Sequence, residues 1–115
     1  MKIGILTGGG DVPPLNSVII SANKRASQSN IELIGFINGW QGVLENKTIH
    51  LLNCEKYSNI GGTILKSSRV NLLNESDGIV RTNENIKKLK IDALIIIGGD
   101  DTLRNAYFIS EIPCI

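Results

Sequence analysis

The chain has 115 residues and a mass of 12.5 kDa, the size of one ordinary domain at most. Twelve basic and eleven acidic residues give a formal net charge of +1, so no strong field favours nucleic acid or a membrane surface as a partner. Apolar residues make up 42% of the chain and charged residues 20%, which indicates a globular rather than a disordered protein. No segment has the length of a membrane span, and Met1–Leu6 does not open a signal peptide. We therefore expect a cytoplasmic protein in which Cys54 and Cys114 are free thiols.

The first segments predict a strand, a glycine turn and a helix in direct succession. Ile3–Leu6 is a short apolar run, and Thr7–Asp11 follows it with three consecutive glycines. Pro13 and Pro14 suit the first turn of a helix, where the missing N–H group is not needed. The apolar residues that follow recur at helical spacing, at Leu15, Val18, Ile19, Ala22 and Ala26. A glycine turn between a strand and a helix directs backbone N–H groups at an anion such as phosphate. The lesser alternative is that the glycines only permit a tight turn.

The next part of the chain predicts a second strand at Ile31–Ile37 and contains two residues, Trp40 and His50, that are considered for a functional role. Trp40, the only tryptophan, comes soon after this strand, where its ring could stack on a ligand. Packing of the same ring in the core is an equally open alternative. His50, the only histidine, alternates with apolar residues, so we expect it at the surface rather than in a catalytic role.

Gly61–Arg69 is a third glycine-rich segment. Lys66 and Ser67 resemble the end of a phosphate-binding loop, but Leu65 stands where that pattern requires a glycine. Arg69 offers a bidentate fork that fits phosphate, and the alternative for it is a solvated surface arginine.

The last third of the chain predicts a helix opened by Thr82 and then a buried central strand at Ile91–Ile97, which contains the unbroken apolar run Ala93–Ile97. Gly98–Thr102, which we call the acidic corner, ends that strand with two glycines, two aspartates and a threonine. Open α/β sheets bind ligands at the carboxyl ends of their strands, and carboxylate oxygens suit a Mg²⁺ ion that bridges phosphates. A further helix is expected from about Thr102, and Ile112–Ile115 predicts the start of another buried strand. The inward positions expected for that helix are Leu103, Ala106 and Tyr107 or Ile109.

These segments, in this order, resemble the amino-terminal part of the 6-phosphofructokinase family. The matching segments are Gly4–Asp11 with Asn16, Gly35–Gly42, Gly61–Leu65 with Ser68 and Arg69, Ile91–Thr102, and Ile112–Ile115. A GGD motif alone is weak, because NAD kinases and diacylglycerol kinases carry a similar one, but the ordered set covers nearly the whole chain. The resemblance implies an α/β fold, a three-layer and mostly parallel sheet with helices on both faces, in a truncated Rossmann-like phosphofructokinase domain spanning residues 1–115.

The resemblance also implies a function, the Mg²⁺-dependent phosphorylation of fructose 6-phosphate to fructose 1,6-bisphosphate in glycolysis. The phosphoryl donor would be ATP or pyrophosphate, and full-length relatives would be homo-oligomers without nucleic-acid or membrane partners. The residues implied for donor binding are Gly10, Trp40, Arg69, Val70, Gly99, Asp100, Asp101 and Thr102. Of these, Asp100 matches the position of the metal ligand.

Two positions within this resemblance favour pyrophosphate as the donor. ATP-using members usually have glycine where this chain has Asp101, whereas pyrophosphate-using members have two consecutive aspartates there. A carboxylate at this point would repel the α-phosphate of ATP and leave room for the shorter donor. Asn105 stands where ATP users often have a small glycine near the adenine.

The family's catalytic base is an aspartate in a loop just after the strand that begins at Ile112, and it does not fall within these 115 residues. The half that binds the sugar phosphate is also absent, so no catalytic residue is assigned. We expect a donor-binding segment that is inactive by itself. The alternatives are a non-catalytic fragment that binds nucleotide or pyrophosphate, and an α/β fragment with no ligand.

Overall fold

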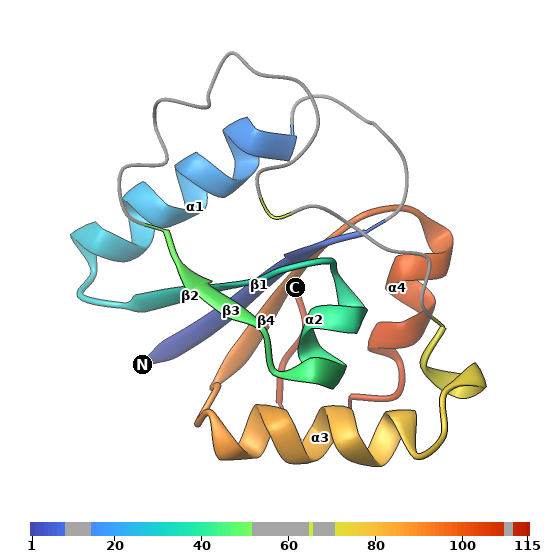
Figure 1. Ribbon diagram of the computed structural model, residues 1–115. Coiled ribbons are helices and arrows are strands. Elements are labelled where there is room, and N and C mark those ends of the chain that lie inside the picture. Colours follow the sequence, from blue (N-terminus) through green and yellow to red (C-terminus); the bar gives the residue numbers. More distant parts are fainter. Residues whose placement is uncertain (9–14, 52–64, 66–70, 110–111) are drawn as a thin grey trace.

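The computed structural model describes residues 1–8, 15–51, 65, 71–109 and 112–115, and for residues 15–17 it describes the backbone only. In this part of the chain a four-stranded sheet lies between helices on its two faces (Figure 1). In chain order the elements are β1 (Lys2–Thr7), α1 (Leu15–Gln28), β2 (Glu32–Phe36), α2 (Trp40–Glu45), β3 (Thr48–His50), the 3₁₀ helix η2 (Leu72–Asn74), α3 (Gly78–Lys88), β4 (Ala93–Ile97) and α4 (Asp100–Ala106). None of the described helices has the length and apolar character needed to cross a bilayer.

The sheet has the strand order β3-β2-β1-β4, with β1 at its centre. β1 pairs in parallel with both β2 and β4, and only β3 runs antiparallel to its neighbour β2. The register places Thr7 of β1 opposite Ile97 of β4, so these two strands end at the same level. The mostly parallel sheet predicted from the sequence is confirmed, and Gly8 and Gly98, the residues that directly follow β1 and β4, lie side by side.

Two apolar clusters lie on opposite faces of the sheet, because successive side chains of a strand point to opposite sides. One cluster joins Leu6 and Leu94 to α2, α3 and α4, and it also contains the fully buried Phe36. The other joins Ile5 to α1 through the fully buried Ile19. Figure 1 shows α1 on one side of the sheet and the other three helices opposite, which confirms the three-layer arrangement.

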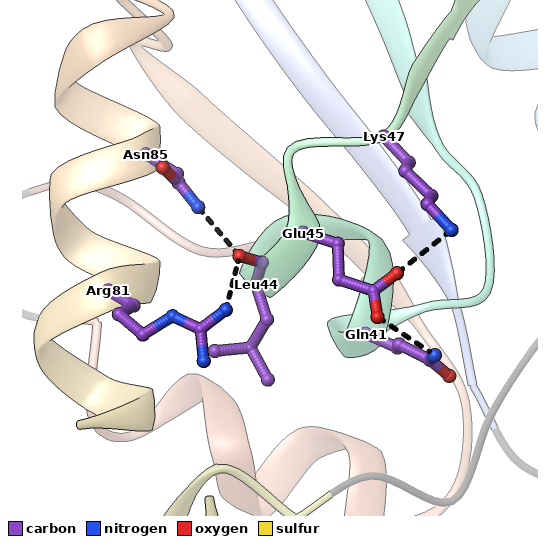
Figure 2. A network of polar contacts seen from close by, with 6 residues as sticks. All are labelled: Gln41, Leu44, Glu45, Lys47, Arg81 and Asn85. Atoms are coloured by element: carbon purple, nitrogen blue, oxygen red, sulfur yellow. Dashed lines mark hydrogen bonds and ion pairs between the residues drawn. The ribbon is translucent and has the colours of Figure 1, made fainter. Parts of the chain in front are cut away.

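The short helix α2 is fastened to α3 at its carboxyl end, as Figure 2 shows. Carbonyl groups in the last turn of a helix lack partners within the helix. Asn85 Nδ2 donates to the carbonyl oxygens of Val43 and Leu44 at 2.8 and 3.0 Å, and Arg81 donates to that of Leu44 at 3.4 Å. These bonds fasten the carboxyl end of α2 to α3, and Trp40 lies at the opposite, amino-terminal end of α2.

A second set of contacts at the end of α2 involves the exposed carboxylate of Glu45 (Figure 2). Lys47 Nζ lies 3.0 Å from one oxygen of Glu45, and Gln41 Nε2 donates to the other at 3.2 Å. Both contacts hold the pKa of Glu45 below its usual value, and the contact with Lys47 has the larger effect.

The inward positions predicted for α4 are only partly right: Ala106 packs against the apolar cluster, and Ile109, the alternative to Tyr107, is buried. Leu103 and Tyr107, expected to face inward, are exposed, whereas the polar Thr102 and Asn105 are buried. The helix also begins at Asp100 rather than at about Thr102. The physical reason is that both buried residues have polar or steric partners on neighbouring elements, so burial does not follow hydrophobicity along this helix.

Two other predictions need correction. Thr82 does not open a helix; α3 begins at Gly78, and Thr82 lies fully buried within it. Ile112–Ile115 does start a parallel pairing, because Cys114 bridges to Leu94 and Ile115 N donates to the Leu94 carbonyl oxygen at 2.8 Å. However, Cys114, a free thiol, and Ile115 are exposed rather than buried, since this segment borders β4 at the edge of the described sheet. The exposed position of His50 is as predicted, and Cys54 lies outside the described residues.

The hydroxyl group of Thr82 generates a stability prediction. Among the described residues, its Oγ1 is a buried side-chain atom without a hydrogen-bond partner, and a buried unsatisfied polar group costs about 1–3 kcal/mol. Thr82→Val keeps the shape and removes the hydroxyl, so urea unfolding should show a gain of about 1 kcal/mol. Asn85→Ala, one turn further along α3, should instead lower stability by a similar amount. Lower stability in Thr82→Val would show that the hydroxyl has a partner in solution.

Candidate functional site

The carboxyl ends of β1 and β4 approach each other so closely that only glycine fits between them. Gly8 N donates to the Ile97 carbonyl oxygen at 2.8 Å, which extends the pairing of the two strands by one residue. A β-carbon at Gly98 would lie 2.8 Å from the Gly8 carbonyl oxygen, closer than real β-carbons come. The missing side chains of Gly8 and Gly98 are therefore a condition of this packing.

Thr102 fills the space that the two glycines leave. It is 6% exposed, and a β-carbon at Gly8 would overlap its hydroxyl group. A β-carbon at Gly98 would lie 2.8 Å from the Thr102 β-carbon. The first turn of α4 thus rests directly on the ends of two strands.

Trp40 holds the same turn from the side of α2. Its ring is 3% exposed, and Nε1 donates to the Thr102 carbonyl oxygen at 3.0 Å. Buried indole N–H groups usually have such a partner. The ring belongs to the apolar cluster that α2, α3 and α4 share, which is the core-packing alternative that the sequence left open. A direct contact between the Trp40 ring and a phosphoryl donor stays a prediction. The buried ring offers little surface for such a contact.

Asn105 connects α4 to η2. It is 5% exposed; its Oδ1 accepts from Leu72 N at 3.1 Å, and its Nδ2 donates to the Asp101 carbonyl oxygen at 3.2 Å. The amide therefore fills the space between the two elements and is bonded to both. No pattern in the sequence indicates these two bonds, since an asparagine on a helix is usually solvated.

The remaining residues of the acidic corner, Gly99, Asp100 and Asp101, are exposed. A β-carbon at Gly99 would find no atom within 4 Å, so a ligand can approach the backbone here. The two aspartates supply hard oxygen ligands. The described residues contain no group of three or more side chains of the kind that encloses a metal ion. This fits Mg²⁺, which proteins usually hold through one or two carboxylates together with the phosphates of a substrate.

The structure therefore brings together part of the set predicted from the sequence. Trp40 and Thr102 form the buried support, and Gly99, Asp100 and Asp101 form the open side. The other predicted donor contacts, Gly10, Arg69 and Val70, lie outside the described residues. The sequence did not predict that Gly8 and Gly98 are contact points between the strand ends. The available signal was that each glycine directly follows a predicted strand.

A family model described as "Phosphofructokinase" matches residues 2–115 of the chain. The chain belongs to the phosphofructokinase family. It is 43% identical to the pyrophosphate–fructose 6-phosphate 1-phosphotransferase of Streptomyces coelicolor, over 100% of this chain and 35% of that protein. The enzyme of the same name from Dictyoglomus thermophilum is 46% identical, over 97% of this chain and 33% of its own length. ATP-dependent 6-phosphofructokinase 3 of Streptomyces coelicolor is 44% identical, over 96% of this chain and 33% of its own.

Solved structures agree with the phosphofructokinase fold. Pichia pastoris phosphofructokinase in the T-state superposes with a TM-score of 0.85 at 27% identity, over 94% of this chain and 12% of that chain. The pyrophosphate-dependent phosphofructokinase of Marinobacter aquaeolei gives a TM-score of 0.77 at 22% identity, over 99% of this chain and 32% of its own, which shows the fold alone. The chain spans about a third of the length of the curated relatives it matches. Both pyrophosphate- and ATP-dependent enzymes are among these relatives.

The packing of Thr102 on Gly8 predicts a difference between two glycine substitutions. Gly8→Ala forces a methyl group into Thr102, and overpacking of this kind costs about 1–3 kcal/mol. Gly99→Ala, whose methyl group would enter open space, should cost less than about 1 kcal/mol. Thermal unfolding of the two variants measures the difference. Equal losses would mean that the β1 and β4 ends are not packed as described.

Proposed function

We propose that this chain is the donor-binding segment of a 6-phosphofructokinase-type phosphotransferase, which binds Mg²⁺ and the phosphoryl donor used to convert fructose 6-phosphate to fructose 1,6-bisphosphate. The observation that carries the proposal is the position of the acidic corner beside Gly8, at the carboxyl ends of two adjacent parallel strands. Ligands of open α/β sheets bind at this edge. The family membership and the names of the relatives support the same reaction.

Phosphoryl transfer depends mainly on positioning and on the neutralisation of charge. A Mg²⁺ ion bound here would neutralise charge on the transferred group and bridge donor oxygens. Asp100 would hold the ion, and the unobstructed backbone at Gly99 admits the donor phosphates. Thr102, packed on the strand ends, keeps this backbone in place. Gly10, Arg69 and Val70 complete the proposed donor contacts.

The chain spans about a third of the length of its curated relatives. We therefore propose one partial domain over residues 1–115, in which donor binding occurs without turnover. The same observation favours a second candidate, a fragment that binds Mg²⁺-pyrophosphate or nucleotide as its only function. A cytoplasmic location and a homo-oligomeric full-length enzyme are part of the proposal by family resemblance.

Two side chains of α4 support pyrophosphate rather than ATP as the donor. Asp101 is exposed directly beside Asp100, so it adds a second negative charge where a longer polyphosphate chain would pass. Asn105 occupies the space between α4 and η2 with both ends of its amide bonded. A small residue at position 101 or 105 would leave room for the longer donor, ATP. This chain has Asp101 and Asn105 at these positions instead.

Removal of one charge tests the metal role of Asp100. Asp100→Asn keeps the size of the side chain but weakens it as a Mg²⁺ ligand, so we expect affinity for Mg²⁺-pyrophosphate to fall roughly 100-fold, or about 2.7 kcal/mol. Isothermal titration calorimetry of the purified chain measures this loss. The matched control is Asp92→Asn, an exposed aspartate at the opposite end of β4, which should bind as the unchanged chain does. Unchanged binding by Asp100→Asn would remove the acidic corner as the site.

Donor choice is tested at Asp101 with two variants. Asp101→Asn removes only the charge, and Asp101→Gly removes both charge and bulk. If Asp101 selects the donor, each should raise affinity for Mg²⁺-ATP relative to Mg²⁺-pyrophosphate, and Asp101→Gly should raise it about tenfold or more. Calorimetry with both donors gives the ratio. A ratio that does not move in either variant contradicts the assignment of donor choice to this residue.

A further inference from the structure

The hydrogen bond from Trp40 Nε1 to the Thr102 carbonyl oxygen joins two elements that lie 62 residues apart in the chain. Its acceptor lies in the first turn of α4, next to Asp101. A helix carbonyl has two lone pairs, so it accepts this bond in addition to one within the helix. Both partners are buried, so water does not replace the bond if it is lost.

The two carboxylates of the acidic corner have no comparable support of their own. With the other described residues, neither Asp100 nor Asp101 forms a side-chain hydrogen bond or ion pair. Their directions therefore follow the backbone of α4, a helix of seven residues. Helices this short are not stable alone and take their geometry from tertiary contacts.

Thr102 makes two such contacts on different parts of one residue. Its side chain packs on Gly8 and Gly98, and its carbonyl group is bound by Trp40. The first contact fixes where the residue sits on the strand ends, and the second fixes the orientation of its peptide group.

We infer that Trp40 is a positioning residue for the Mg²⁺ and donor site, acting through the Thr102 carbonyl group rather than by contact with the donor. This inference rests on the proposed function of the acidic corner. If Trp40 served core packing alone, any aromatic ring of sufficient size would replace it. The indole N–H group is what separates the two roles, because phenylalanine supplies the ring without the donor.

The test compares Trp40→Phe with Asn85→Ala, which removes two partly buried side-chain bonds to carbonyl groups at the other end of α2. Amide hydrogen exchange is followed at Leu103, whose N–H donates within α4, and at Arg81 in α3 as a reference. We expect Trp40→Phe to accelerate exchange at Leu103 about tenfold relative to Arg81, and to weaken Mg²⁺-pyrophosphate binding about tenfold by calorimetry. Asn85→Ala should do neither.

A measurement on the unchanged chain complements the variants and does not depend on their folding. Trp40 is the only tryptophan, so its indole N–H gives a single NMR signal. Because coupling between sites is reciprocal, saturating Mg²⁺-pyrophosphate should slow exchange of this proton by about the factor that Trp40→Phe loses in affinity. Faster exchange at Leu103 with unchanged donor binding, or an indole signal that the donor does not protect, would overturn the inference. If the unchanged chain fails to bind Mg²⁺-pyrophosphate, the proposed function fails, and equal exchange at Leu103 in both variants would separately refute the positioning role.

Discussion

The close approach of β1 and β4 at Gly8 and Gly98 is the constraint on which the rest of the site depends. Parallel strands that end at the same level place the residues that follow them side by side, and here the first of these residues, Gly8 and Gly98, are also in contact. Because neither glycine has a side chain, Thr102 can pack against both and set α4 directly on the sheet. The exposed carboxylates of this helix are therefore held at the edge where open α/β sheets bind their ligands.

The same helix separates a buried polar side from an open acidic one. Thr102 and Asn105 face the protein and are bonded to Trp40 and η2, whereas Asp100 and Asp101 face solvent. A typical buried hydrogen bond contributes only about 1 kcal/mol, but an unmet partner costs more, so these bonds define one orientation of the helix. If the proposed function holds, this orientation sets where a metal ion and a phosphoryl donor would be held.

The layered α/β fold was predictable because its signals are local. Unbroken apolar runs that end in glycine indicate buried strands, and the order of those segments indicates the family. Predictions failed where a long-range contact overrides hydrophobicity. Leu103 and Tyr107 are exposed because Thr102 and Asn105 find partners on α2 and η2, and no pattern along α4 contains those partners. Thr82 was also predicted to open a helix, but it lies inside α3, which begins four residues earlier at Gly78.

By itself, the sequence determined the strand and glycine pattern, the phosphofructokinase family and the acidic residues at the end of β4, because each is encoded in neighbouring residues. Only the tertiary structure decided that Gly8 and Gly98 touch, that Thr102 rests on them, and that the ring of Trp40 is buried with its N–H bound to the backbone. These contacts join residues far apart in the chain. Their existence depends on the strand register and on how α2 and α4 pack, and neither is written in any local segment.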